Sequence, residues 1–202
     1  VDIRYGHTVQ SLDELAGADV IVGADGVNSL VRRADETAFG TTIRYLSNRF
    51  VWFGTTKRFE TLTQTFVKHR LGYFNAHHYR YSDTMSTFII ETDAATFAKS
   101  GLATLDEAAL KAALEEGFAD TLDGHPLISN RSIWRQFPVI HNERWSRGNT
   151  VILGDALHTA HFSIGSGTRL ALEDAIALAR ALAASPRDVP AALAGYEAER
   201  RP

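Results

Sequence analysis

Two short apolar strands, each followed at once by glycine and aspartate, are the strongest constraint on how this 202-residue chain folds. The first reads Val20-Ile21-Val22-Gly23-Ala24-Asp25-Gly26 and the second reads Val151-Ile152-Leu153-Gly154-Asp155. Fully apolar strands are typical of parallel sheets that are covered on both faces. Open α/β sheets bind ligands at the carboxyl ends of such strands. The pattern therefore predicts an α/β core with an aspartate at the ligand-binding end of each strand.

The residues after the first strand have two interpretations. Gly26 allows close backbone approach, Ser29 is placed to cap a helix, and Arg32 is placed to pair with a carboxylate or a phosphate. In the alternative interpretation the segment is a tight turn, in which Asp25 caps its own backbone. The sequence of this segment leaves both open.

The residues after the second strand favour a binding function. Gly165-Ser166-Gly167-Thr168 opens a helix predicted over residues 168–184, and free N–H groups at a helix start suit an anionic oxygen. Asp155, an acceptor when ionised, suits a ribose or ribityl hydroxyl. His158 and His161 could instead be metal ligands, but the loop offers neither an H-E-x-x-H pattern nor a third ligand at helical spacing. We predict no metal site.

Residues 41–136 have a different pattern, rich in β-branched and aromatic side chains. Four runs have the composition of strands, at residues 43–56, 63–68, 71–81 and 85–92. One helix is predicted, because Thr104-Leu105-Asp106-Glu107 forms a capping box before apolar residues at helical spacing. This region is therefore predicted to be an antiparallel sheet domain with one helix, and the fold class is α/β (α+β).

Composition excludes several classes of function. The chain has no cysteine, which removes disulfide, thiolate and iron–sulfur chemistry and is compatible with a cytoplasmic protein. Lysine and arginine number 21 against 24 acidic residues, so a nucleic-acid partner is not expected. Every apolar run is shorter than the ~20 residues of a membrane span. The sequence reads as that of a soluble protein of the cytoplasm.

The two strand-end segments together resemble a known family, the FAD-dependent aromatic hydroxylases. These are single-component flavoprotein monooxygenases with the p-hydroxybenzoate hydroxylase fold. The family's D-G-x-x-S-x-x-R motif is matched by Asp25, Gly26, Ser29 and Arg32. Its G-D-A-x-H motif and following G-x-G are matched by Gly154, Asp155, Ala156, His158, Gly165 and Gly167. Both motifs occur in the family's order, so the resemblance covers essentially the whole chain.

The resemblance implies a fold and a reaction. Residues 1–40 and 137–202 would form part of a Rossmann-like FAD-binding domain, into which residues 41–136 insert as the substrate domain. NADH or NADPH would reduce FAD, and O2 would add to give a C4a-hydroperoxide that hydroxylates a small aromatic substrate. Asp155 would hold the ribityl chain, the helix start at residues 165–168 would face the flavin pyrimidine edge, and Asp25 and Arg32 would serve the pyrophosphate and NAD(P)H. The predicted cofactor-binding residues are Asp25, Gly26, Ser29, Arg32, Gly154, Asp155, Ala156, His158, Gly165, Ser166, Gly167 and Thr168.

The segment around Phe162 departs from the usual family pattern. Relatives commonly have proline four residues after the motif histidine, and this chain has Phe162 there. We name His161 and Phe162 as candidates for the flavin edge and assign no catalytic residue firmly. The string from His158 to Thr168 is most similar to the branch that hydroxylates aromatic acyl-CoA thioesters, such as salicylyl-CoA and 2-aminobenzoyl-CoA. It is also similar to the indole-hydroxylating enzymes of violacein synthesis.

Four residues are predicted to line a pocket for the aromatic substrate. His77 and His78 adjoin on a predicted strand and so point to opposite faces, which leaves one of them for the substrate side. The predicted pocket residues are His77, Tyr79, Trp134 and Phe137. Core packing is the alternative for the aromatic residues.

The family's first βαβ unit, with G-x-G-x-x-G, has no counterpart in these 202 residues. Residues 1–5 alternate as a half-buried strand does, so we expect the chain to start within a domain, without the unit for the adenosine half of FAD. The 202-residue chain alone is then expected to be inactive. The alternatives are a non-catalytic fragment or binding module, or part of a related flavoprotein reductase or halogenase.

Overall fold

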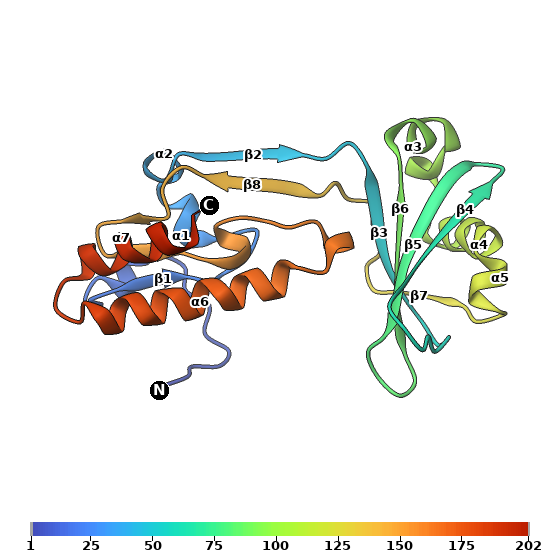
Figure 1. The fold of residues 1–202 in the computed structure, drawn as a ribbon. Helices are drawn as coiled ribbons and strands as arrows, with labels where there is room; N and C mark the ends of the chain where they lie inside the picture. Colours follow the sequence, from blue (N-terminus) through green and yellow to red (C-terminus); the bar gives the residue numbers. More distant parts are fainter. Residues whose placement is uncertain (1, 202) are drawn as a thin grey trace. The chain divides into compact units, whose positions relative to one another are not determined.

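A computed structural model describes residues 2–201, and the chain divides into two compact units. Unit 1 combines Val1–Arg44 with Pro138–Pro202, and unit 2 is the continuous segment Tyr45–Phe137. In Figure 1 the blue segments from the start of the chain pack with the orange and red segments from its end, whereas green and yellow elements make up most of unit 2. Unit 1 is therefore discontinuous in sequence.

Unit 1 is an α/β structure built on a small sheet. Strand β1 (Ile21–Gly23) pairs in parallel with β10 (Thr150–Ile152), and β10 pairs antiparallel with β9 (Ser146–Arg147). Helices α6 (Gly167–Ala184) and α7 (Val189–Arg200) pack on each other. The remaining elements of unit 1 are η1 (Leu12–Leu15), α1 (Leu30–Arg33), α2 (Glu36–Phe39), β8 (Pro138–Asn142), η3 (Gly154–Ala156), η4 (Phe162–Ile164) and most of β2 (Thr41–Tyr45).

The two apolar strands of unit 1 are predicted to be covered on both faces, and this is confirmed for β10 but not for β1. Val151 and Ile152 on β10 are completely buried, as expected for a strand covered on both faces. On β1, however, Val22 is 43% exposed, so one side of that strand is open to solvent among the described residues. Burial of β10 gives the following Gly-Asp turn a fixed starting point.

Unit 2 is built on a five-stranded antiparallel sheet in the order β4-β5-β6-β3-β7. Its strands are β3 (Arg49–Thr55), β4 (Thr63–His69), β5 (Gly72–Arg80), β6 (Ser86–Thr92) and β7 (Leu127–Ser129). The segment between β6 and β7 forms α3 (Ala94–Ser100), η2 (Leu102–Thr104), α4 (Glu107–Gly117) and α5 (Ala119–Leu122). These helices cover one face of the sheet (Figure 1).

Strand alternation decides which side chains meet the helices. Phe53, Phe74 and Phe88 share one face of the sheet and pack into a core with residues of α4 and α5. Residues one position along each strand, such as Trp52, His77 and Ile89, therefore lie on the opposite face.

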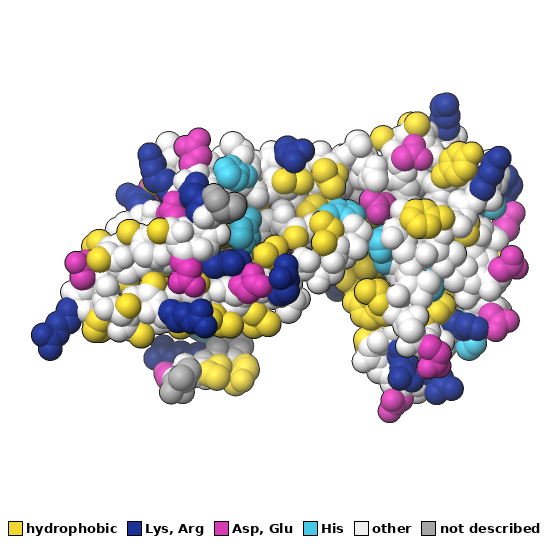
Figure 2. Space-filling model, viewed as in Figure 1, with side chains coloured by type: hydrophobic (Ala, Val, Ile, Leu, Met, Phe, Trp, Pro, Cys, Tyr) yellow, Lys and Arg dark blue, Asp and Glu magenta, His cyan; other side chains and the backbone are white. Residues whose placement is uncertain are grey.

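In the view of Figure 2, basic and acidic side chains are interspersed on the visible surface, in keeping with the near-balanced composition.

Three expectations about local structure are wrong. Residues 2–5 form no strand, and Ile3 and Tyr5 are strongly exposed; Val1 lies outside the described residues. The 93–122 region holds more than one helix, since α3 and α5 flank the predicted one. Thr104 does not cap α4: Asp106 does, accepting a hydrogen bond from the Ala109 N–H at 2.8 Å. Thr104 ends a separate 3-10 turn, because Gly101 in the left-handed region closes α3 before it.

The fold class is confirmed, since the structure mixes helices with parallel and antiparallel strands. The helix predicted over residues 168–184 is confirmed as well, since α6 ends at Ala184. Helix α7 follows it, with Pro190 in its first turn. No helix within residues 2–201 is both long enough and apolar enough to cross a lipid bilayer.

Candidate functional site

The first predicted segment is a tight turn that supports a short helix. The Asp25 Oδ2 atom accepts hydrogen bonds from the N–H groups of Leu30 at 2.6 Å and Val31 at 3.3 Å. Ser29 caps the same helix, α1, by accepting a hydrogen bond from the N–H three residues later at 2.9 Å. Gly26 makes the turn possible with a φ of 75°. Asp25 thus caps the backbone of its own turn, as in the tight-turn interpretation of this segment. A contact between Asp25 and a cofactor stays a prediction.

Arg32 lies inside unit 1 and is only 1% exposed. Its guanidinium donates hydrogen bonds to the carbonyl oxygens of Ala156 at 2.8 Å and Val27 at 2.6 Å. Burial lowers the pKa of Arg32, while the nearby Glu36 and Asp25 carboxylates act in the opposite direction. Ala156 belongs to the second motif, 124 residues away, so Arg32 joins the two predicted segments directly. Its predicted role toward pyrophosphate and NAD(P)H stays a prediction.

The second predicted segment turns one carboxylate outward. Gly154 takes a φ of 59°, and a Cβ at this position would lie 3.1 Å from the Ala171 Cβ on α6. Gly154 and Ala156 are buried, whereas Asp155 between them is exposed. Within residues 2–201 the Asp155 carboxylate has no protein partner. The turn after β10 therefore leaves the Asp155 carboxylate exposed to solvent, and its contact with a cofactor stays a prediction.

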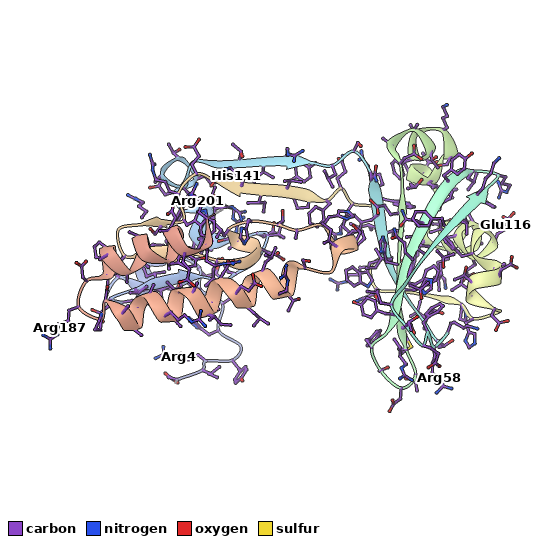
Figure 3. The ribbon with its side chains drawn as sticks, in the orientation of Figure 1. Arg4, Arg58, Glu116, His141, Arg187 and Arg201 are labelled. Atoms are coloured by element: carbon purple, nitrogen blue, oxygen red, sulfur yellow. The ribbon has the colours of Figure 1, made fainter. Side chains whose placement is uncertain are left out.

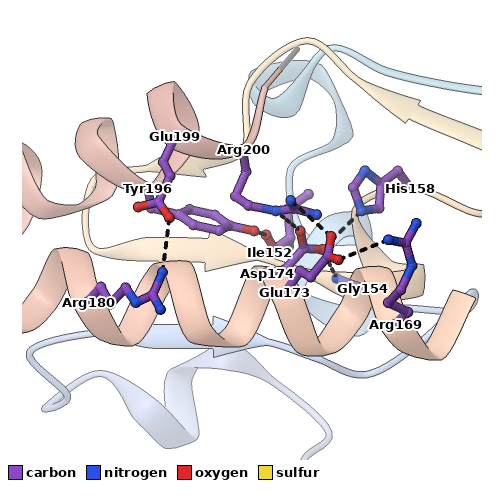
Figure 4. Close-up of polar contacts among 10 residues, drawn as sticks. All are labelled: Ile152, Gly154, His158, Arg169, Glu173, Asp174, Arg180, Tyr196, Glu199 and Arg200. Carbon is purple, nitrogen blue, oxygen red and sulfur yellow. Dashed lines mark hydrogen bonds and ion pairs between the residues drawn. The ribbon is translucent and has the colours of Figure 1, made fainter. Parts of the chain in front are cut away.

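A buried carboxylate on α6 holds this turn in place, and sequence reasoning missed it. The Asp174 Oδ2 atom accepts a hydrogen bond from the Gly154 N–H at 3.0 Å and lies 2.9 Å from the His158 Nε2 atom (Figure 4). The Oδ1 atom accepts a hydrogen bond from the Arg200 Nε at 2.9 Å. We call these four residues the Asp174 cluster. Its signal in the sequence is an aspartate on the apolar face of a helix, four residues after Leu170.

The electrostatics of the Asp174 cluster favour the ionised carboxylate. Burial alone raises the pKa of Asp174, but hydrogen bonds from His158, Arg200 and the Gly154 N–H outweigh burial and lower it. His158 also packs edge-on against Trp145, with 5.4 Å between ring centroids. His158 therefore faces into unit 1 toward Asp174, and its predicted contact with a cofactor stays a prediction.

The last part of the unit 1 site is the start of α6. Gly165 adopts a φ of 67° and closes the short turn η4, and α6 begins two residues later with Ser166 as its N-cap. The Ser166 side chain makes no capping hydrogen bond, so the first-turn N–H groups at Gly167 and Thr168 have no partner within the helix. Before them, the rings of His161 and Phe162 lie 4.1 Å apart between centroids. The described segment has the predicted order of turn and helix.

The predicted pocket residues of unit 2 lie in different places. His77 and Tyr79 are on β5, on the sheet face opposite the helices. Trp134 is on the helix side of the sheet, edge-on to Phe97 with 5.3 Å between ring centroids. It therefore packs against the hydrophobic core, which is the alternative to a pocket role. Phe137 ends unit 2, where its carbonyl accepts a hydrogen bond from the Leu46 N–H. Unit 2 thus brings His77 and Tyr79 to one face, without Trp134.

Proteins of known sequence give matches over nearly all of the chain. Salicyloyl-CoA 5-hydroxylase from a Streptomyces species is 44% identical over 210 residues, covering 100% of this chain and 41% of the relative. A 3-hydroxy-4-methyl-anthranilyl-[aryl-carrier protein] 5-monooxygenase from Streptosporangium sibiricum is 46% identical, covering 99% of this chain and 53% of the relative. The chain spans about half the length of the curated relatives it matches.

A solved structure shares the fold. PqsL, a probable FAD-dependent monooxygenase from Pseudomonas aeruginosa, superposes with a TM-score of 0.64 at 26% identity, over 90% of this chain and 51% of that chain. Residues 8–202 match the family described as FAD binding domain. Because this match covers nearly the whole chain, the protein belongs to the FAD binding domain family of flavoproteins.

Proposed function

We propose that this chain is the part of an NAD(P)H-dependent flavoprotein monooxygenase that binds the flavin half of FAD and an aromatic substrate. The observation that carries the proposal is the Asp155 carboxylate, exposed at the end of a buried strand and without a protein partner among the described residues. A carboxylate placed in this way suits a hydroxyl donor such as those of a ribityl chain.

The residues present fit a flavin. Asp155 supplies the acceptor, and the start of α6 at Gly167 and Thr168 supplies N–H donors with the positive end of an 18-residue helix behind them. We assign Asp155 to the ribityl hydroxyls and the α6 start to the polar edge of the isoalloxazine ring. The Asp174 cluster keeps both together, because Asp174 on α6 is hydrogen-bonded to the N–H of Gly154, beside Asp155.

When bound, the flavin takes electrons from NAD(P)H and activates O2 so that one oxygen atom reaches the aromatic ring. The chain's own residues supply the surroundings for this chemistry. Donors at the start of α6 stabilise negative charge on the ring system that they face. We assign to Phe162, which begins the η4 turn before that helix, the exclusion of water from the flavin.

For the substrate we propose an aromatic acyl thioester whose ring carries a hydroxyl or amino group. Relatives at 44% and 46% identity are named for salicyloyl-CoA and for an anthranilyl group on an aryl-carrier protein. The face of the unit 2 sheet with His77 and Tyr79 is the surface we assign to the ring. Its exposed aromatic residues include Trp52 and Tyr79, which suit ring stacking.

The test is the FAD affinity of Asp155→Ala in the full gene product, measured by fluorescence titration. Loss of a charged acceptor costs about 1.5–3 kcal/mol, which is a ten- to 150-fold weaker affinity. Asp19→Ala is the matched control, because Asp19 is also exposed in unit 1 but lies before β1. Equal FAD affinity for wild type and Asp155→Ala would contradict the assignment, whereas a change in Asp19→Ala would show a nonspecific charge effect.

A further inference from the structure

The sheet face of unit 2 opposite the helices carries large aromatic side chains that are open to solvent. Phe66 on β4 is 72% exposed, and Tyr73 on β5 is 62% exposed. Strand register places Lys68 across from Tyr73, with Phe66 diagonal to that pair on the same face. We call Phe66, Lys68 and Tyr73 the Phe66 patch.

The hydrophobic core does not account for these exposed rings. On the other face of the same two strands, Val67 and Phe74 already pack with the helices, so the core of unit 2 is filled without the Phe66 patch. Strand β4 is an edge strand, which leaves the patch open along one side. A single exposed apolar residue needs no explanation, but aromatic rings that adjoin one another beside a cation are typical of a ligand-binding surface.

The charge of the patch is positive. The Lys68 ammonium lies 5.9 Å from the centroid of the Tyr73 ring, which is a cation–π contact. Among the described residues, no carboxylate forms an ion pair with Lys68. The nearby cation Arg70 does have such a partner, since its Nη2 atom lies 3.1 Å from the Oε2 atom of Glu116 on α4 (labelled in Figure 3). Lys68 is therefore available to an anionic group beside the rings.

The geometry points to the Phe66 patch as the surface that binds the nucleotide end of a coenzyme A thioester. This inference rests on the proposed function and selects coenzyme A, rather than a carrier protein, as the group that bears the aromatic acyl substrate. An adenine ring stacks on aromatic side chains through its π face, and lysine binds phosphate as a point charge. A carrier protein presents the same pantetheine arm without adenosine, so it would leave the rings of the patch uncovered.

The separation along the sheet suits such a molecule. The face assigned to the substrate ring holds His77 and Tyr79 on β5, and Tyr73 lies earlier on the same strand and the same face. At about 3.3 Å per residue, Tyr73 is about 13 Å from the first of these positions and about 20 Å from the second. An extended pantetheine arm with its pyrophosphate is of that order of length. The aromatic ring and the adenine can therefore occupy two places on one sheet face.

The experiment compares two thioesters with the FAD-loaded full gene product. They are 2-aminobenzoyl-CoA and 2-aminobenzoyl-pantetheine, which has the same ring, thioester and arm but no nucleotide. Dissociation constants are measured by isothermal titration, and we expect wild type to bind the CoA thioester at least about tenfold more tightly. Phe66→Ala and Tyr73→Ala should each weaken binding of the CoA thioester at least about fivefold, the lower limit for one base stacked on one aromatic ring. Binding of the pantetheine thioester, FAD affinity and Tm should not change.

Lys68→Gln tests the charge of the patch. It should weaken binding of the CoA thioester at low ionic strength and less at high ionic strength, because salt screens exposed charges. Tyr45→Ala is the matched control for the aromatic variants, since Tyr45 is also 62% exposed but lies on β2, outside the five-stranded sheet. It should bind both thioesters as wild type does.

Three results overturn the assignment of the Phe66 patch to coenzyme A. The first is equal affinity of wild type for the two thioesters, or unchanged affinity for the CoA thioester in both aromatic variants. The second is a rise in the KM for NAD(P)H that matches the loss of thioester binding, which would assign the patch to the adenine of the cosubstrate. The third is an equal loss of affinity for a 2-aminobenzoyl group on a holo carrier protein, which would assign the patch to that protein. A gene product that binds neither FAD nor either thioester overturns the proposed function as well, and its missing flavin absorbance identifies that case.

Discussion

Asp174 is the single side chain on which the unit 1 site depends most. It holds the Gly154 N–H, His158 and Arg200 at once, and it is completely buried. Removing one partner of a buried ion pair leaves the other charge uncompensated, at a cost of about 3–5 kcal/mol. Asp174→Asn should therefore lower the free energy of unfolding by roughly 3 kcal/mol, measured by urea denaturation at pH 7.

Glu173→Gln is the control for this prediction. Glu173 adjoins Asp174 on α6 but forms its ion pairs with Arg169 and Arg200 near the surface, where such pairs contribute about 0–1 kcal/mol. If Glu173→Gln destabilised the protein as much as Asp174→Asn does, helix charge rather than the buried cluster would explain the loss.

His78 gives unit 2 a pH dependence of stability. Burial lowers the pKa of His78 to about 4, and the neighbouring His77 adds to the effect. The unfolded chain takes up this proton below about pH 6.5, and the folded chain takes it up only near pH 4. Stability from this residue is therefore complete above pH 6.5 and falls by at most about 3 kcal/mol as the pH drops to 4.

His78→Phe should remove most of this loss, since the ring at 78 stacks on Phe88 and packs at a tilt against Phe59, and phenylalanine keeps both contacts. The measurement is urea unfolding at a series of pH values between 7 and 4. His141→Gln, at an exposed position of unit 1 (Figure 3), should leave the slope unchanged. A slope equal to wild type in His78→Phe would assign the pH dependence to other groups.

At the scale of elements, β1 and α1 meet at a glycine. A Cβ on Gly23 would lie 2.7 Å from the Val31 Cβ and 3.0 Å from the Ile152 Cγ2, closer than packed atoms allow. Gly23→Ala should therefore destabilise the chain by about 1–3 kcal/mol in urea unfolding. Gly195→Ala is the control: Gly195 lies within α7 with open space around it, so alanine there should stabilise by roughly 0.5–1 kcal/mol. Destabilisation by both changes would rule out a specific contact at Gly23.

Sequence patterns identify long elements better than short ones in this chain. Helices α6 and α7 are predictable, because apolar residues recur at helical spacing and glycine and proline mark their starts. Helix α3 is not, since its seven residues are too few for a periodic pattern, and its structure depends on the Asp93 cap and on packing over β5. The start of α4 is ambiguous because Thr104 and Asp106 are both capping residues, and tertiary context selects Asp106.

At the scale of the whole molecule, each unit has its own hydrophobic core. Ile152→Val and Ile90→Val remove one methylene from completely buried positions in unit 1 and unit 2, at a cost of about 1 kcal/mol each. We expect Ile90→Val to speed amide hydrogen exchange about fivefold in β3 and β6 but not in β1 and β10, and Ile152→Val to do the reverse. Faster exchange in both units from either change would show one cooperative structure instead.

The candidate site is only partly predictable from sequence, for a reason visible in its contacts. Asp155 is found because glycine and aspartate follow an apolar strand, which is a local pattern. Two partners of Asp174 lie 20 residues before it and 26 after it, and the hydrogen bond between Asn48 and Glu91 joins residues 43 positions apart. Local pattern carries no information about such pairings, because packing decides them.

The pairing of β2 with β8 has a consequence for the order of folding. The chain enters unit 2 at Tyr45, the last residue of β2, and leaves it before β8, and these strands lie side by side (Figure 1). Parallel pairing of β1 with β10 requires residues on either side of unit 2 to meet, and the entropy lost in closing that loop grows with its length. Unit 2 is continuous and gathers its own ends at Leu46 and Phe137. When unit 2 folds first, its two ends are already close together, so pairing β1 with β10 closes a much shorter flexible segment. Folding of unit 2 then lowers the entropy cost of joining the two halves of unit 1.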